Sequence, residues 1–412
     1  MSCLGVGAER GYERCWGSMK KLLLLGGSHA EIPLIKAAKE MGYYVITSGN
    51  QRNGIGHSFA DEYAPCDFSN KEAITSLAEQ LQVDAICSGC NDFAALSAAY
   101  ASERLGLGGH DAYQTSLKLH HKDQYRQLAE KLDIVTPNAY RCESQEQLQQ
   151  ISEKMVFPVI VKPVDLTGGK GIRRCDTMEE LQSAYDEAVA ITRESFVIVE
   201  QFIMGTNHGF SAYLQNEQVV FAFADNEQYY HNPYLVSGAS TPGDIPTEAR
   251  QQLIDDCEKI AHDLHLCDGI LHIQLILTEE NVPVIIEICR RTPGDLYVEL
   301  VRKATGMEYA KYIVGAEAGL KMPRPEYHQP SKYYVRHCVM ADHDGVVDGI
   351  DVAAEIRPFI VDQLSLFHKG ETISEYLKYK AAIVFLCFAT KQQYMDYIDK
   401  LPQMLTIRYR LE

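Results

Sequence analysis

The segment VIVKPVDLTGGKGI, residues 159–172, contains the residues best suited to hold a phosphate group. Its apolar β-branched residues predict a buried strand, so Lys162 lies where that strand ends. The run Thr167-Gly168-Gly169-Lys170-Gly171 follows, and glycine can adopt the positive φ angles that point successive backbone N–H groups at one anion. A surface hairpin tip is the alternative interpretation of this loop. Neither G-x-x-x-x-G-K-[ST] nor G-x-G-x-x-G occurs here, so the functional context must come from the rest of the chain.

Strands and amphipathic helices alternate along the first part of the chain. Strands are predicted at residues 21–27, 43–49, 62–67 and 83–89, and helices at residues 30–42 and 71–82. This alternation indicates a doubly wound parallel sheet, and hence a Rossmann-like first domain. The turn Gly26-Gly27-Ser28-His29 could hold a pyrophosphate in such a sheet, but its glycine fingerprint is incomplete and a tight βα turn is the preferred interpretation.

A second set of elements follows this domain. It consists of a lysine-bearing helix, two strands that flank the glycine loop, and longer strands with hairpins up to Arg291. The turn Glu279-Glu280-Asn281 joins the last pair of strands as a hairpin. Prolines between Pro323 and Pro330 mark a linker, so we expect a smaller C-terminal domain with strands at residues 332–341 and 381–389.

The composition argues against several functions. The formal net charge of −17 argues against general nucleic-acid binding, because phosphate backbones require clustered Lys and Arg. The 12 cysteines show no paired metal-ligand spacing apart from the lone Cys87-Ser-Gly-Cys90, which favours free thiols in a reducing compartment. No apolar stretch approaches the length that spans a bilayer, and residues 1–18 are interpreted as an extension or tag. We therefore expect a cytoplasmic protein without a membrane partner.

The order of these pieces resembles the ATP-grasp superfamily. Lys122 on a helix, Lys162 at a strand end, the glycine loop, a strand that ends at Glu200 and a hairpin that carries Gln274 and Glu287 follow one another as they do in that family. The C-terminal segment, residues 367–401, looks like the closing domain of its L-amino-acid ligase branch. Biotin carboxylase and carbamoyl-phosphate synthase are similar at a greater distance.

The resemblance implies a multidomain fold of the α/β and α+β classes. A Rossmann-like pre-ATP-grasp domain would cover residues 19–115, and the ATP-grasp domain would cover residues 116–322. A mobile lid would lie at about residues 135–200 and close over the β- and γ-phosphates of ATP, which keeps water from a reactive intermediate. Residues 331–412 would form the C-terminal α/β domain.

The resemblance also implies a nucleotide site. Lys122 and Lys162 would offset phosphate charge, although a solvated helix face is the alternative for Lys122. The hinge from Glu200 to Ile203 would clamp adenine, and Asn207 or His208 would replace the acidic residue that holds the ribose in many relatives. The implied nucleotide-binding residues are Lys122, Lys162, Thr167, Gly168, Gly169, Lys170, Gly171, Glu200, Gln201, Phe202, Ile203 and His208.

A magnesium site is implied on the hairpin. Relatives place a carboxylate on its first strand and a Glu-x-Asn pair on its second, because Mg²⁺ prefers hard oxygen ligands. This chain has Gln274, Glu287 and Cys289 at these positions. Glu287 and Gln274 are the implied ligands, whereas the soft thiol of Cys289 makes a second metal weakly held or absent. An ion pair with Arg290 or Arg291 is the alternative for Glu287.

Two arginines that follow the hairpin complete the implied catalytic set. Arg291 matches the arginine that the family places near the transferred phosphoryl group, and Arg290 is a second candidate beside it. Lys162 is the third implied catalytic residue. Residues 229–246 lie where relatives shape the substrate pocket, and a loop packed on its own aromatic residues is an equal alternative.

These resemblances imply an ATP-dependent ligase that converts a carboxylate to an acyl phosphate and joins it to an amine, with ATP and Mg²⁺ as cofactors. An amino acid is the carboxylate that the resemblance favours. A bicarbonate-activating, carboxylase-like enzyme is one alternative. A non-catalytic nucleotide-binding module is another, suggested by Gln274 and Cys289. The expected partners are the small-molecule carboxylate and amine, and a homodimer stays open because many relatives are dimers.

Overall fold

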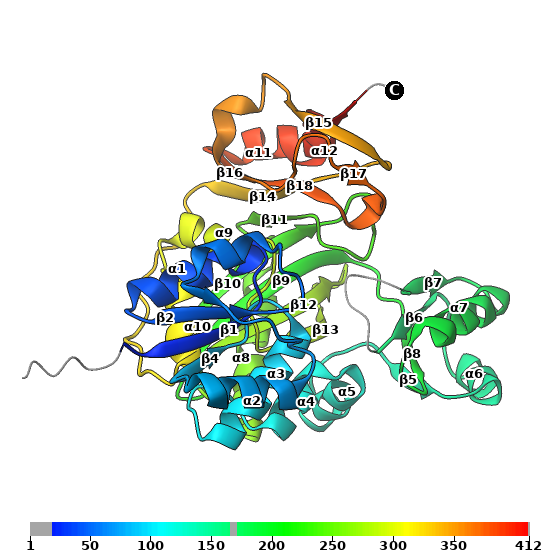
Figure 1. The fold of residues 1–412 in the computed structure, drawn as a ribbon. Helices are drawn as coiled ribbons and strands as arrows, with labels where there is room; N and C mark the ends of the chain where they lie inside the picture. Colours follow the sequence, from blue (N-terminus) through cyan, green and yellow to red (C-terminus); the bar gives the residue numbers. More distant parts are fainter. Residues whose placement is uncertain (1–18, 165–170, 411–412) are drawn as a thin grey trace, which may run out of the picture.

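The computed structural model describes residues 19–164 and 171–410 (Figure 1). The loop residues Thr167, Gly168, Gly169 and Lys170, expected to contact phosphate, lie outside the described residues. Gly171, the last residue of that loop, has a φ of +74°, which favours glycine. A side chain at this position would also meet Pro163 at 2.7 Å.

The N-terminal domain is built on a parallel sheet of four strands in the order β3-β2-β1-β4. Leu22 to Leu25 are fully buried, because helices cover this sheet and parallel strands are apolar on both faces. The Rossmann-like architecture expected from the sequence is therefore present. Its elements are β1 (Lys21–Leu25), α1 (Ile32–Glu40), β2 (Tyr44–Ser48), β3 (Glu62–Tyr63), α2 (Lys71–Leu81), β4 (Ala85–Cys87) and α3 (Asp92–Leu105).

The turn between β1 and the first helix is closed by its own side chains. The backbone N–H and the hydroxyl of Ser28 donate to Glu31 Oε2 at 2.8 and 2.7 Å. This is a capping box, in which cap and third residue satisfy each other's polar groups. The geometry agrees with a tight βα turn.

The segment predicted to form the lid, called the lid below, is an antiparallel sheet that projects from the body of the molecule, at the right of Figure 1. Its strands lie in the order β5-β8-β6-β7. Valines of β6 and β8 pack against two helices in a small core of their own. A separate core lets this part keep its shape as a unit. Its elements are β5 (Ala139–Cys142), α6 (Gln145–Ser152), β6 (Val159–Pro163), β7 (Arg173–Cys175), α7 (Met178–Ile191) and β8 (Val197–Gln201).

The central sheet has eight strands in the order β13-β12-β9-β10-β11-β14-β18-β16. Its strands before the C-terminal part are β9 (Thr206–Gln215), β10 (Gln218–Gln228), β11 (Gly238–Thr241), β12 (Gly269–Leu277) and β13 (Pro283–Cys289). Helices α5 (Lys122–Lys131) and α8 (Thr247–Leu264) pack on one face, where Phe210 and Ile273 are buried. Helices α9 (Tyr297–Thr305) and α10 (Tyr309–Glu317) lie on the other face with the N-terminal domain, and α4 (Tyr113–His120) leads into α5.

The C-terminal part extends the central sheet. Strand β11 pairs with β14 from Gly238 opposite His337 to Thr241 opposite Tyr334, so the sheet runs across the linker that the sequence suggested as a boundary. This part has its own apolar core, at the top of Figure 1. Its elements are β14 (Tyr333–Met340), β15 (Gly345–Val352), β16 (Ile360–Ser365), β17 (Thr372–Ile373), β18 (Lys380–Phe388), α11 (Lys391–Tyr397), α12 (Leu401–Met404) and β19 (Leu405–Tyr409).

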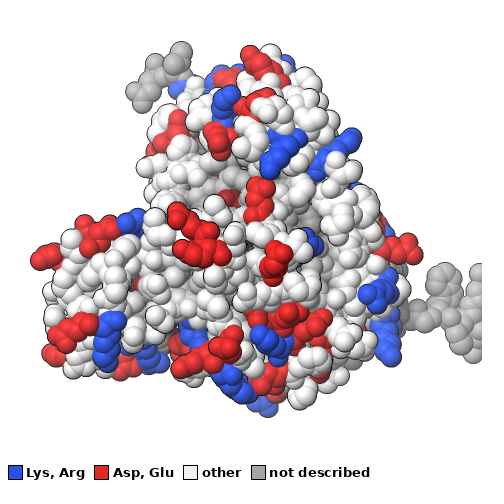
Figure 2. All heavy atoms as spheres, turned by 180° about the vertical axis from the view of Figure 1, so that it is seen from behind, with Lys and Arg blue, Asp and Glu red and all other residues white. Residues whose placement is uncertain are grey.

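The surface shows no gathering of one charge over the face seen in Figure 2. Basic and acidic side chains are intermixed there, unlike the clustered Lys and Arg that a nucleic-acid backbone requires. Across the described residues, none of the helices has the length and apolar character needed to cross a membrane.

Candidate active site

A row of facing residues crosses four strands of the central sheet. Glu287 on β13 lies opposite Gln274 on β12, Gln274 lies opposite Gly209 on β9, and Gly209 lies opposite Asp225 on β10. Residues that are directly opposite each other share one face of a sheet. The sheet therefore places two carboxylates and an amide on the face turned towards α9.

Gly209 makes room in the middle of this row. A Cβ atom at this position would lie 2.6 Å from Oδ2 of Asp225. The missing side chain thus lets the Asp225 carboxylate lean over β9, where Tyr297 of α9 donates to it at 2.7 Å. Tyr297 and Asp225 are both buried.

A cavity of about 110 Å³ opens above this row. Its wall combines acids from the central sheet with two arginines, one after β13 and one on β14. The polar side chains that matter for its chemistry are Asp225, Glu227, Gln274, Glu287, Arg291 and Arg336. A concave, charged cavity of this kind is the expected place for a small polar ligand.

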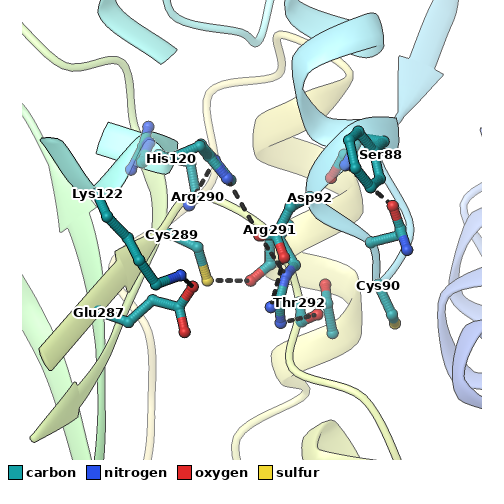
Figure 3. A network of polar contacts seen from close by, with 12 residues as sticks. Ser88, Cys90, Asp92, His120, Lys122, Glu287, Cys289, Arg290, Arg291 and Thr292 are labelled. Atoms are coloured by element: carbon teal, nitrogen blue, oxygen red, sulfur yellow. Dashed lines mark hydrogen bonds and ion pairs between the residues drawn. The ribbon is translucent and has the colours of Figure 1, made fainter. Parts of the chain in front are cut away.

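Lys122 and Glu287 form an ion pair at one side of the cavity (Figure 3). Lys122 is the first residue of α5, and its Nζ donates to Glu287 Oε1 at 2.9 Å. Burial disfavours the charge of Lys122, but Glu287 and then Glu200 more than offset this and raise its pKa. Lys122 in turn lowers the pKa of Glu287. Both groups therefore keep their charges at neutral pH.

Arg291 is held by an acid from the N-terminal domain. Asp92, at the start of α3, accepts from Nε of Arg291 at 3.0 Å and from Nη2 at 3.1 Å (Figure 3). His120 contacts the same carboxylate through Nδ1 at 3.1 Å, and its Nε2 accepts from the Arg290 backbone N–H. Burial disfavours the charge of Asp92, but Arg291 and His120 offset this and hold its pKa well below the usual range. The guanidinium plane of Arg291 is therefore fixed.

Arg290 has a different environment from its neighbour. Its Nε donates to Asp111 at 2.8 Å, and its two terminal nitrogens donate to the backbone oxygens of Ile270 and Cys267 at 2.6 and 2.7 Å. Successive residues of an extended chain point to opposite sides, so Arg290 is directed away from the cavity that Arg291 lines. The expected catalytic role of Arg290 is therefore not supported, and its contacts are those of a structural residue.

Lys162 lies inside the lid, where it meets the carboxylate of Glu200. Its Nζ donates to Glu200 Oε2 at 2.6 Å, and Arg126 of α5 donates to Glu200 Oε1 at 2.9 Å. Burial would raise the pKa of Glu200, but Lys162 and Arg126 more than offset this and lower it to about 2. Arg126 also donates to the Ile286 oxygen at 2.7 Å, which ties the lid hinge to the hairpin strand β13.

The hinge residues after β8 are only partly consistent with an adenine site. The Glu200 side chain is fully buried in its ion pairs, so it orients Lys162 and does not face a base. The N–H groups of Gln201 and Phe202 donate to Asn138 and Pro158 oxygens at 2.9 and 3.2 Å, so other backbone groups of the hinge would have to recognise adenine. Gln201, Phe202 and Ile203 are exposed or half-buried, and their contact with adenine stays a prediction.

His208 does not face the cavity. It alternates with Gly209 along β9 and so lies on the side of Phe210, which packs in the core under α8. Its ring bonds to Thr206 Oγ1 at 2.7 Å and to the Asp225 backbone oxygen at 3.3 Å. Burial lowers the pKa of His208. A ribose contact is therefore not supported by this geometry.

Glu287 and Gln274 fit one Mg²⁺ ion. Gln274 uses its amide nitrogen to donate to Glu227 at 2.9 Å, which turns the carbonyl oxygen, the metal-binding atom, away from that bond. Cys289 does not fit a second ion, because burial raises the pKa of its thiol to about 11 and a neutral thiol is a poor ligand for a hard cation. The donor set thus supports one metal position.

A lid over a β-hairpin, with lysines from a helix and from a lid strand, is the architecture of the ATP-grasp fold. Residues 121–324 match the protein family described as the ATP-binding domain of the carbamoyl-phosphate synthase L chain. The chain also matches the formate-dependent phosphoribosylglycinamide formyltransferase of Prochlorococcus marinus strain MIT 9303, with 30% identity over 187 residues, which are 45% of this chain and 47% of that protein. The chain thus spans about half the length of the curated relatives it matches.

Two solved structures extend the comparison to 95% of the chain. The L-amino acid ligase of Bacillus licheniformis has a TM-score of 0.82 and 18% identity, with 99% of it covered. The biotin carboxylase domain of Hydrogenobacter thermophilus 2-oxoglutarate carboxylase, in complex with MgADP, ADP and bicarbonate, has a TM-score of 0.76 and 19% identity, with 91% covered. The prediction of an ATP-grasp superfamily protein is confirmed. ATP and Mg²⁺ are the cofactors of this class, which includes ligases.

Sequence reasoning missed four side chains of the cavity region, which are Asp92, Asp225, Glu227 and Arg336. They come from three separate parts of the chain, and only the fold brings them together. One signal was present for Asp225, since it continues the alternating series of Phe221 and Phe223 and so falls on a buried face. Of the segment 229–246, Val236 and Ala239 line the cavity and Tyr229 donates to Glu227 at 2.6 Å.

Proposed function

We propose that this protein is an ATP-dependent ligase that activates an amino-acid carboxylate as an acyl phosphate and transfers the acyl group to an amine. One observation carries the proposal. Glu287 and Arg291, which Lys122 and Asp92 hold in place, line the same cavity as acids that can bind an ammonium group. The similarity in fold to an L-amino acid ligase supports the same substrate class.

The lysines would act on the phosphates of ATP. Lys162 has three N–H donors, of which one is directed at Glu200, so the others remain for phosphate oxygens. Lys122 supplies a second positive charge at the edge of the hairpin. Mg²⁺ on Glu287 and the Gln274 carbonyl would further reduce the negative charge of the phosphates during transfer.

Arg291 would position the carboxylate. A carboxylate oxygen attacks the γ-phosphorus, an O–P bond forms, and the bond to ADP breaks. The amine then attacks the acyl carbon, the C–N bond forms, one proton leaves the nitrogen, and phosphate departs with the electron pair of the C–O bond. A planar guanidinium fixed by Asp92 can hold two oxygens in this sequence without rearranging.

The test is ADP formation from ATP and Mg²⁺ with amino acids offered singly and in pairs, and with formate and bicarbonate alongside. We expect ADP with an amino acid plus an amine. We expect Lys162→Met to lower the rate at least ~100-fold, because the uncharged side chain fills the same space without the charge. Lys321→Met, on an exposed position, is the matched control and should keep full activity.

Other outcomes would replace the proposal. ADP with bicarbonate alone would indicate a carboxylase-like enzyme. ADP with formate alone would indicate that formate is the carboxylate substrate, as in the name of the Prochlorococcus relatives. Binding of ATP with no turnover on any member of the panel would indicate a nucleotide-binding module.

The cellular setting and the assembly belong to the same proposal. The ten cysteines that the structure describes are free thiols, which suits the reducing cytoplasm. A homodimer is the proposed assembly, since the related biotin carboxylase domain is a dimer. Size-exclusion chromatography with light scattering tests the assembly, and a monomer at micromolar concentration would contradict it.

A further inference from the structure

Two buried polar atoms in the cavity have no partner within the part of the chain that the structure describes. They are Oδ1 of Asp225 and Nε of Arg336. Asp225 is 1% exposed and Arg336 is 3% exposed, and both line the cavity. A buried donor or acceptor without a partner costs free energy, so such atoms point to a ligand that completes them.

The two atoms carry opposite charge. Asp225 acts together with Glu227, two residues along β10 on the same face, and the carboxyl groups of both interact. The side-chain donors that reach this pair are the neutral Tyr297, Tyr229 and Gln274. The positive charge of Arg336 acts on both carboxylates from a distance, but no cation among the described residues forms a salt bridge with either of them at 4.0 Å or less, so a positive group from a ligand can enter there.

The positive side of the cavity is held in place by acids and by the backbone. Arg336 of β14 donates from Nη1 to the Asp295 backbone oxygen at 3.2 Å and lies 3.5 Å from the carboxylate of the same residue, and Arg291, held by Asp92, lines the same cavity. Both guanidinium groups can therefore receive a carboxylate without moving.

We infer that the cavity is a subsite for a small zwitterionic amino acid, with its ammonium group on Asp225 and Glu227 and its carboxylate towards Arg291 and Arg336. This inference rests on the proposed function and specifies its substrate. The acid pair accepts the three N–H donors of an ammonium group, and the arginines take the two carboxylate oxygens.

The size of the cavity sets the size of the amino acid. A volume of about 110 Å³ has room for a few water molecules or for one small organic molecule. Val236, Ala239 and Pro293 supply an apolar part of the wall. Glycine and alanine fit this space, whereas a larger side chain would have to extend through the open side of the cavity.

The test measures binding by titration calorimetry in the presence of Mg²⁺ and a non-hydrolysable ATP analogue. The ligands are L-alanine, propionate, which lacks only the amino group, and L-phenylalanine. We expect the wild type to bind L-alanine roughly tenfold or more tightly than propionate, and to bind L-phenylalanine more weakly than L-alanine. We expect Asp225→Asn and Glu227→Gln to lose this preference while propionate binds as before. Glu280→Gln, an exposed acid in the β12–β13 turn, is the control and should behave as wild type.

Several results would overturn the subsite. A wild type that does not distinguish alanine from propionate excludes ammonium recognition. Variants that keep the preference exclude these two acids. If the variants bind Mg²⁺ more weakly and keep their affinity for the amino acid, the acid pair is a metal site. The ADP assay separates the ligase proposal from the subsite proposal. If amino acids support ADP formation but Asp225→Asn and Glu227→Gln still prefer alanine to propionate, only the subsite is refuted. Ammonium-dependent binding without any turnover refutes only the ligase.

Discussion

Replacement of Asp225 by asparagine should stabilise the folded protein at neutral pH although it damages substrate binding. Burial, and after it the charge of Glu227, raises the pKa of Asp225 from 3.8 to about 7. A folded-state pKa above the unfolded value means that the folded state binds the proton more tightly. Ionised Asp225 therefore destabilises the fold, and this penalty grows as the pH rises from 3.8 to about 7.

The magnitude follows from the size of this difference. A shift from 3.8 to about 7 corresponds to about 4 kcal/mol at about 1.36 kcal/mol per pKa unit. In the Asp225→Asn variant the new amide keeps an oxygen to accept from Tyr297 but leaves its NH₂ group in place of the unpartnered Oδ1, which costs about 1–3 kcal/mol. The net gain at pH 8 is therefore about 1–3 kcal/mol, or a few degrees in melting temperature.

The pH dependence separates this effect from a change in packing. The free-energy cost of the unpartnered NH₂ group is independent of pH. The penalty of ionised Asp225, which the substitution removes, increases by about 2 kcal/mol between pH 5 and pH 7. The charged or titratable groups that face Asp225 are Glu227 on β10, His272 on β12, Glu287 on β13, Asp295 before α9, Tyr297 on α9, and Arg291 and Arg336.

The assay is differential scanning calorimetry of wild type, Asp225→Asn and the control Glu280→Gln at pH 5 and pH 8. We expect the advantage of Asp225→Asn to be larger at pH 8 than at pH 5, and we expect no such difference for Glu280→Gln. A variant that is less stable than wild type at pH 8, or equally shifted at both pH values, would refute the reasoning.

Two further predictions concern the lid and the metal position. The pKa of Glu200 falls from 4.5 to about 2 in the folded state, so its stabilisation is present above pH 4.5 and is lost as the pH falls towards 2. Between pH 6 and pH 3 the free energy of unfolding should therefore fall by about 2 kcal/mol more in wild type than in Glu200→Gln, as measured by urea unfolding, and parallel pH profiles would contradict this. Cys289→Asn should lower the Mg²⁺ concentration needed for half-maximal nucleotide binding several-fold, since it adds an amide oxygen beside Glu287. An unchanged Mg²⁺ titration, with the melting temperature preserved, would show that this position does not contact the metal.

Local patterns were sufficient to predict the parallel sheet of the first domain and the strand that carries Lys162. They also predicted the hairpin that pairs Gln274 with Glu287, because the turn and both strands lie within about twenty residues of sequence. These features depend on neighbours along the chain.

The acid pair could not be predicted in this way. Gln274 reaches Glu227 of the acid pair only because β9 lies between β12 and β10, and this strand order is decided by contacts between distant segments. The same holds for Arg291, since its partner Asp92 is 199 residues away. Arg290 and His208 were assigned to the site by position alone. Side chains alternate along an extended chain, and in the structure both residues point to the side away from the cavity.

The pairing of β11 with β14 has a consequence for how this protein can be cut or recombined. Deletion of the chain from Tyr333 onwards would leave the four residues of β11 as a bare edge, with unpaired N–H and C=O groups able to join another molecule. Such a truncated chain should aggregate when expressed. The segment from Tyr333 onwards therefore cannot be replaced independently of the central sheet, and a chimera with a relative would need its junction outside this sheet.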